Sequence, residues 1–142
     1  MKRPACVLLP ILCSSLQAQQ RQEPLAEFSY VAAAVPGDSA PVATPCRSHL
    51  LLTGYAGYFD GSRLAAHVTV RGDTLIANIT AVHADSTDAS GWTPVRWQLI
   101  VWALPQATSW VRVFLEGRVR PALDHALSRD ATPPDDAHRC TA

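Results

Sequence analysis

From residue 46 onward, apolar and polar residues alternate with a period of two, which is the period of a β-strand. Residues 64–70 show the pattern most clearly, with leucine, alanine and two valines on one face and alanine, histidine and threonine on the other. Residues 96–104 are apolar on both faces, which is typical of a central strand. The pattern predicts strands at residues 48–55, 64–70, 74–82, 96–104 and 109–116.

Short turns separate these strands. Asp60-Gly61 and Gly72-Asp73 are dipeptides typical of tight turns between antiparallel strands. Five strands within roughly 70 residues are typical of a small sandwich or barrel. We therefore predict an all-β fold: a small antiparallel β-sandwich of about five to seven strands, with a small β-barrel as the alternative.

The segments on either side of the strand region differ from it in composition. Residues 27–31 favour a short edge strand, and residues 35–45, with three prolines, favour a linker. Pro121 suits the first turn of a helix, so residues 121–128 are predicted to form one or two helical turns. We divide the chain into a leader at 1–18, a segment at 19–45 rich in proline, alanine and glutamine, a sandwich domain at 46–120 and a C-terminal segment at 121–142.

The first eighteen residues have the pattern of a secretory signal peptide. Lys2 and Arg3 precede a short apolar run, and a small-residue region follows, with cleavage expected after Ala18. The apolar run is much shorter than the roughly 20 residues that span a bilayer, so we expect no membrane span in the mature chain. The chain is therefore predicted to be exported, to the periplasm or the cell exterior.

Removing the leader changes the charge and the chemistry that the chain can perform. Without Lys2 and Arg3, ten arginines stand against twelve acidic residues, which gives a formal charge of −2 and no lysine. Lysine Schiff bases and phosphate-loop nucleotide hydrolysis are thereby excluded. The near balance of charge argues against a nucleic-acid partner.

Two of the four cysteines remain after cleavage, Cys46 and Cys140. In an oxidising compartment, an even pair far apart in sequence indicates a disulfide. Closing a loop of about 95 residues stabilises a fold by roughly 4 kcal/mol in the chain-entropy model. A metal-binding or catalytic thiol is the alternative, but neither cysteine has a CxxC or Cys–His spacing. We expect no metal and no cofactor.

Four tryptophans lie within nineteen positions, at 92, 97, 102 and 110. Strand alternation directs Trp97 to the core and Trp102 to the opposite face together with Gln98, while Trp110 shares an outward face with Arg112. If residues 96–104 and 109–116 pair as a hairpin, Trp102 and Trp110 lie close together on one face. Such a face suits a sugar ring or a partner protein. In the alternative, a second sheet or the C-terminal segment covers it.

Residues 97–117 contain an alternating strand, Leu104-Pro105, a short turn and a second alternating strand that ends at Gly117. This arrangement resembles the closing hairpin of small secreted bacterial sandwiches of the immunoglobulin-like or prealbumin-like kind. Ala107 and Trp110 stand where glycine and tyrosine often follow the Leu-Pro pair in those modules. The resemblance covers about 20 residues and implies a fold, without implying an activity.

These observations favour an exported, non-catalytic binding or interaction module at the cell envelope. Its expected site comprises Gln98, Trp102, Trp110 and Arg112, and its expected partner is a protein or a glycan. One alternative is a small secreted hydrolase with a site built from loops around His83, Asp85 and Ser90. The other is a structural accessory domain of an envelope assembly.

Overall fold

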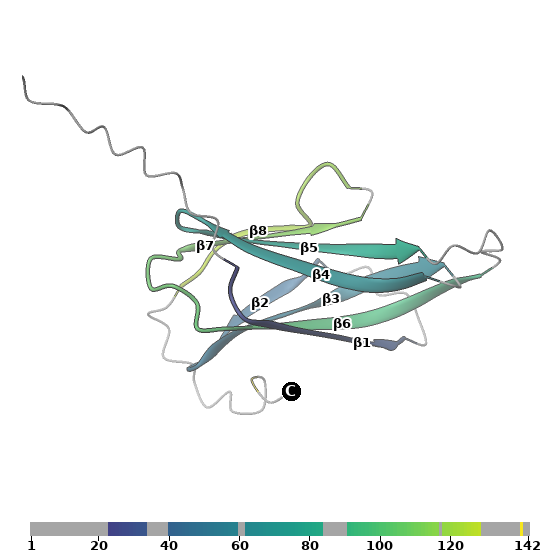
Figure 1. The fold of residues 1–142 in the computed structure, drawn as a ribbon, viewed down its shortest axis with the longest axis horizontal. Helices are drawn as coiled ribbons and strands as arrows, with labels where there is room; N and C mark the ends of the chain where they lie inside the picture. The colour runs from purple at the N-terminus through teal and green to yellow at the C-terminus, as the bar shows by residue number, and fades with distance from the viewer. Residues whose placement is uncertain are drawn as a thin grey trace, which may run out of the picture.

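The computed structural model describes residues 23–33, 40–59, 62–83, 91–116, 118–128 and Cys140. These residues form an all-β fold of two four-stranded sheets packed face to face, so the predicted β-sandwich is confirmed (Figure 1). It has eight strands, where five to seven were predicted. The strands are β1 (Ala26–Ala32), β2 (Val42–Pro45), β3 (His49–Phe59), β4 (Ser62–Arg71), β5 (Thr74–His83), β6 (Trp92–Trp102), β7 (Trp110–Leu115) and β8 (Leu123–Ala126).

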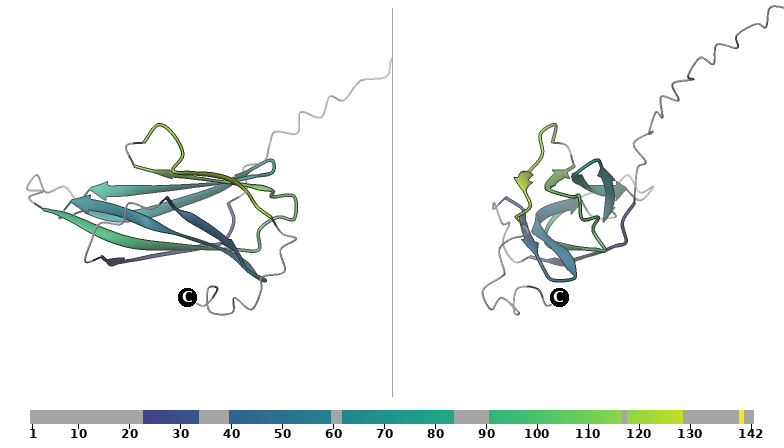
Figure 2. Two further views of the ribbon diagram at one scale, coloured as in Figure 1. Left: turned by 180° about the vertical axis from the view of Figure 1, so that it is seen from behind. Right: turned by 90° about the vertical axis from the view of Figure 1, so that its left-hand side faces the viewer.

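The two sheets differ in how their strands pair. The first sheet has the order β1-β6-β3-β2 and is antiparallel throughout. The second has the order β4-β5-β7-β8, and its β5–β7 pair is parallel. Figure 2 shows the two layers from behind and from one end.

The core lies between the sheets and contains the inward residue of each alternating pair. Trp97 is its largest fully buried side chain, as the alternation predicted. Its indole lies across Gly54, the residue opposite it on β3, so closely that a Cβ at Gly54 would be 2.5 Å from the ring. The other members of the core cluster are Leu50, Leu52, Val68, Val70, Leu75, Ala77, Ile79, Leu99, Val101, Val111 and Val113.

The predicted hairpin of residues 96–104 and 109–116 is wrong, because β6 and β7 belong to different sheets. The connection from β6 to β7 contains a turn, in which the amide of Thr108 donates a hydrogen bond to the carbonyl of Pro105. The amides of Ser109 and Trp110 then donate to the carbonyl of Asp73, at distances of 2.8 and 3.1 Å. These bonds start β7 beside the first residues of β5, which makes the pair parallel.

The two other predicted turns have different outcomes. Gly72, with a φ of +60°, and Asp73 close the predicted β4–β5 hairpin, in which His67 is opposite Asn78. Residues 60 and 61 lie outside the described part of the chain. The strands on either side of them, β3 and β4, are in different sheets, so they do not form the expected hairpin.

Both flanking segments contribute strands. The predicted edge strand at 27–31 is β1, which pairs with β6, and β2 lies within the predicted linker. The helical turns predicted at 121–128 are wrong, because β8 pairs with β7 there. The amides of Ala122 and Leu127 donate hydrogen bonds to the carbonyls of Val113 and Ser109, and these bonds hold the segment against β7. Pairing with the edge of β7 therefore outweighs the helix tendency of Pro121. The sheets therefore extend beyond residues 46–120 on both sides.

The predicted disulfide is confirmed. Cys46, the residue after β2, is bonded to Cys140, with Sγ atoms 2.11 Å apart and Cα atoms 5.9 Å apart. The bond spans 94 positions. The predicted leader lies outside the described residues, and within them no helix has the length and apolar character needed to cross a membrane.

Candidate binding face

The four residues of the predicted site fall on two opposite faces of the sandwich. Val101 and Val111 point into the core, so their neighbours Trp102 and Trp110 point outward from different sheets. Gln98 lies on the same outward face as Trp102, and Arg112 lies with Trp110. The expected proximity of Trp102 and Trp110 is therefore wrong, and the cause is the assignment of β6 and β7 to different sheets.

On the outer face of the second sheet, Asp124 engages both predicted residues. The Nε1 atom of Trp110 donates to Oδ1 of Asp124, and Nε of Arg112 donates to the same oxygen at 3.0 Å. The hydrogen bond from Trp110, followed by that from Arg112, lowers the pKa of Asp124 below its usual value. Trp110 and Arg112 thus tie β7 to β8 through a carboxylate that the sequence analysis did not single out.

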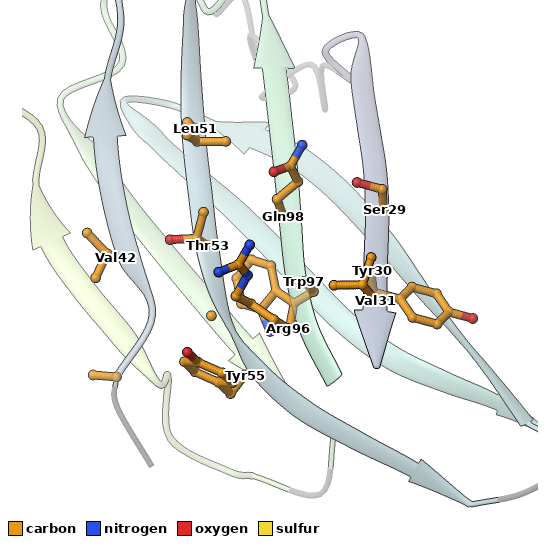
Figure 3. Close-up of a pocket in the computed structure, with 12 residues that line it drawn as sticks. Ser29, Tyr30, Val31, Val42, Leu51, Thr53, Tyr55, Arg96, Trp97 and Gln98 are labelled. Atoms are coloured by element: carbon orange, nitrogen blue, oxygen red, sulfur yellow. The ribbon is translucent and has the colours of Figure 1, made fainter. Parts of the chain in front are cut away.

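The outer face of the first sheet carries a hollow of about 570 Å³ (Figure 3). Ser29, Gln98 and Thr53 form a row across its floor, since Gln98 is opposite Ser29 on one side and Thr53 on the other. Figure 3 shows these three side chains on neighbouring strands β1, β6 and β3. None of the three makes a side-chain hydrogen bond to another residue that the structure describes.

A second row lies two residues farther along the strands. Arg96 is its centre, with Val31 opposite on β1 and Tyr55 opposite on β3. Arg96 is the one charged side chain among the described residues that line the hollow. Within that described part of the chain, its guanidinium forms neither an ion pair nor a hydrogen bond.

Exposed apolar side chains border the two rows. Val31 on edge strand β1 is 60% exposed, and Val42 on edge strand β2 is 55% exposed. At the Arg96 end, Trp92 is 50% exposed. Its ring occupies the space that a Cβ at Gly57 would need, so the indole lies directly over the backbone of β3.

The opposite end of this face is closed by aromatic packing. Trp102 contacts His49, its partner on β3, with ring centroids 4.8 Å apart. Leu51 and Ile100, the next pair along, are buried although they point away from the core. The face therefore runs from a packed end at Trp102 to a more open end at Trp92.

Gln98 and Trp102 were predicted on this face, whereas five further residues were not: Ser29, Thr53, Tyr55, Trp92 and Arg96. One available signal was the alternation of β6, which puts residue 96 on the same side as residues 98 and 102. A second signal was Gly57, because a glycine inside a strand often marks a close approach by another group. The contributions of β1 and β3 depend on strand order, which alternation does not give.

The other candidate sites, a hydrolase site and a metal site, gain little support from the residues that the structure describes. Asp85 and Ser90 of the alternative hydrolase site lie outside the described residues, and His83 ends β5 opposite Ser62. Among the residues that the structure describes, no group of three or more His, Cys, Asp or Glu side chains is placed to hold a metal ion. No protein-family model matches the chain, and no curated protein or solved structure matches it either.

Proposed function

We propose that this protein is an exported, non-catalytic binding module that acts at the cell envelope and binds its ligand in the hollow on the first sheet. The observation that carries the proposal is the convergence of Ser29, Thr53, Gln98 and Arg96, whose side-chain polar groups have no partner among the described residues. Side-chain polar groups that line the same hollow without hydrogen-bonding to one another are available to orient a ligand.

The size and border of the hollow support the same function. Its volume of about 570 Å³ is within the range of small-ligand sites in proteins. Val31 and Val42 expose apolar surface on either side, and a bound ligand would remove that surface from water. The outer face of the second sheet differs, because Asp124 already engages Trp110 and Arg112 there.

Two features support export to the envelope. The leader pattern at residues 1–18 predicts secretion. The Cys46–Cys140 bond joins positions far apart in sequence, and such bonds form and persist in oxidising compartments.

A panel of defined oligosaccharides, covering neutral, amino and acidic sugars, tests the proposal on the oxidised chain without its leader. Thr53→Ala removes a hydroxyl from the hollow, and Thr80→Ala makes the same change on the exposed surface of the second sheet. We expect Thr53→Ala to weaken binding roughly fivefold, the effect of one hydrogen bond, and Thr80→Ala to have no effect. Equal effects of the two variants, or a panel without any binding, would contradict the proposal.

A panel of ester, glycoside and peptide substrates tests the non-catalytic part. We expect no turnover. Turnover of any substrate above the rate in buffer would favour the hydrolase alternative and contradict the proposal.

A further inference from the structure

The charge of the hollow indicates the chemistry of its ligand. Arg96 is the one charged side chain among its described lining residues, and it lies between two uncharged neighbours, Val31 and Tyr55. Glu27 is on the same face but is opposite Ile100, four residues along β6 and about 14 Å from Arg96. Among the residues that the structure describes, none compensates this positive charge, and the formal charge of the chain without its leader is −2.

The guanidinium group favours a particular anion. Its planar fork of N–H donors matches a carboxylate, which it binds through two parallel hydrogen bonds. Arg96 is exposed on the face of β6, so its guanidinium is accessible to a ligand. A carboxylate on the ligand would give the guanidinium of Arg96 an ion-pair partner, which none of the described residues provides.

The neighbouring row indicates what surrounds the carboxylate. The hydroxyls of Ser29 and Thr53 and the amide of Gln98 can each donate and accept hydrogen bonds. Sugar hydroxyls have the same double capacity. An extended peptide, by contrast, is bound chiefly by main-chain bonds to a free strand edge, whereas these groups lie on strand faces. The row therefore favours a saccharide over an acidic peptide.

Trp92 adds an aromatic surface at the open end. Its indole rests on Gly57 and is 50% exposed, so one ring face is available for stacking. Gln98 and Trp92 are six residues apart on one strand, a separation of about 20 Å. That length exceeds one sugar ring and favours an oligosaccharide.

From these observations we infer that the hollow binds an oligosaccharide that contains uronic acid. Arg96 binds the carboxylate, Ser29, Thr53 and Gln98 bind hydroxyls, and Trp92 stacks on a pyranose ring. This inference rests on the proposed function and specifies the class of ligand for the same site.

Calorimetric titration of the oxidised chain without its leader tests the inference with three probes. These are trigalacturonic acid, its neutral methyl ester and a pentaglutamate peptide. Arg96→Gln removes the positive charge from the hollow, and Arg63→Gln removes one from an exposed position on edge strand β4. We expect trigalacturonic acid to bind at least about tenfold more weakly to Arg96→Gln and unchanged to Arg63→Gln.

The remaining probes and variants separate the inference from the proposed function. We expect the methyl ester to bind more weakly than the acid and to be indifferent to Arg96→Gln, and Trp92→Ala to weaken both trisaccharides. Equal binding of acid and ester, both weakened by Thr53→Ala, would overturn the acidic assignment and leave the binding face standing. If pentaglutamate binds and depends on Arg96 in this way, while neither sugar binds, the assignment of a saccharide ligand would be overturned. Binding of no probe would overturn the uronic acid, and the panel of neutral, amino and acidic sugars would then decide the proposed function.

Discussion

Gly57 lies directly beneath the indole of Trp92 on the outer face of the first sheet. A Cβ at this position would overlap three atoms of the ring, so the contact requires a residue without a side chain. Because Trp92 is 50% exposed, its ring can move away into solvent. Gly57 therefore sets the position of an aromatic surface and takes no part in the packing of the core.

Gly57→Ala should displace the indole of Trp92 while changing the free energy of unfolding by less than about 1 kcal/mol. The displaced ring becomes more accessible to water. Acrylamide quenching should therefore increase, with a red shift of part of the tryptophan emission. Unchanged quenching would show that the ring does not depend on Gly57 for its position.

Gly54→Ala is the matched change on the inner face. There the neighbouring indole belongs to Trp97, which is fully buried and closely packed. The ring cannot move into solvent, so we expect the free energy of unfolding to fall by about 1–3 kcal/mol, the usual cost of overpacking a core. Chemical denaturation measures the loss. A variant as stable as the parent chain would contradict the packing described for Trp97.

Reduction of the Cys46–Cys140 disulfide should lower the melting temperature by an amount on the order of 15 °C. The bond spans 94 positions, and opening it restores conformational freedom to most of the chain. Calorimetry with and without reductant measures the shift. The double variant Cys46→Ser/Cys140→Ser, which should melt like the reduced chain and ignore reductant, is the control. A melting curve indifferent to reductant in the parent chain would contradict the account.

Stability should decline as the pH falls below about 4, because two carboxylates have lowered pKa values in the folded state. Hydrogen bonds from Ser109 and then Thr74 lower the pKa of Asp73, and those from Trp110 and Arg112 lower the pKa of Asp124. The usual pKa of an aspartate side chain is 3.8. The folded state thus binds fewer protons than the unfolded state, and the contribution is complete above the unfolded pKa and is lost as the pH falls through the folded one.

The double variant Asp73→Asn/Asp124→Asn tests that assignment, because amides do not titrate. Its melting temperature should depend less on pH between 5 and 2 than that of the parent chain. The same steep decline in both proteins would place the responsible carboxylates elsewhere.

Alternation made the strands predictable, since it reports which side chains share a face. It identified the β4–β5 hairpin and the inward direction of Trp97 from local patterns alone. It could not assign β6 and β7 to different sheets. That assignment depends on the bonds from the amides of Ser109 and Trp110 to Asp73, 36 and 37 positions earlier in the chain.

The candidate site was predictable only in part for the same reason. The face of Gln98 and Trp102 follows from the period of β6. Ser29 and Thr53 join it because β1 and β3 pair with β6, which no local pattern specifies. Trp110 and Arg112 would lie with them only if the short connection between β6 and β7 were a hairpin turn, and these two strands are in different sheets.

Amide chemical-shift mapping of the ¹⁵N-labelled oxidised chain, titrated with trigalacturonic acid, shows which face of the sandwich holds the ligand. We expect the shifts to change at Ser29, Thr53, Arg96 and Gln98, on three strands of the first sheet. We expect no change at Thr80 or Arg112 on the second sheet. Changes confined to the second sheet, or the absence of any saturable change, would contradict a ligand site on the outer face of the first.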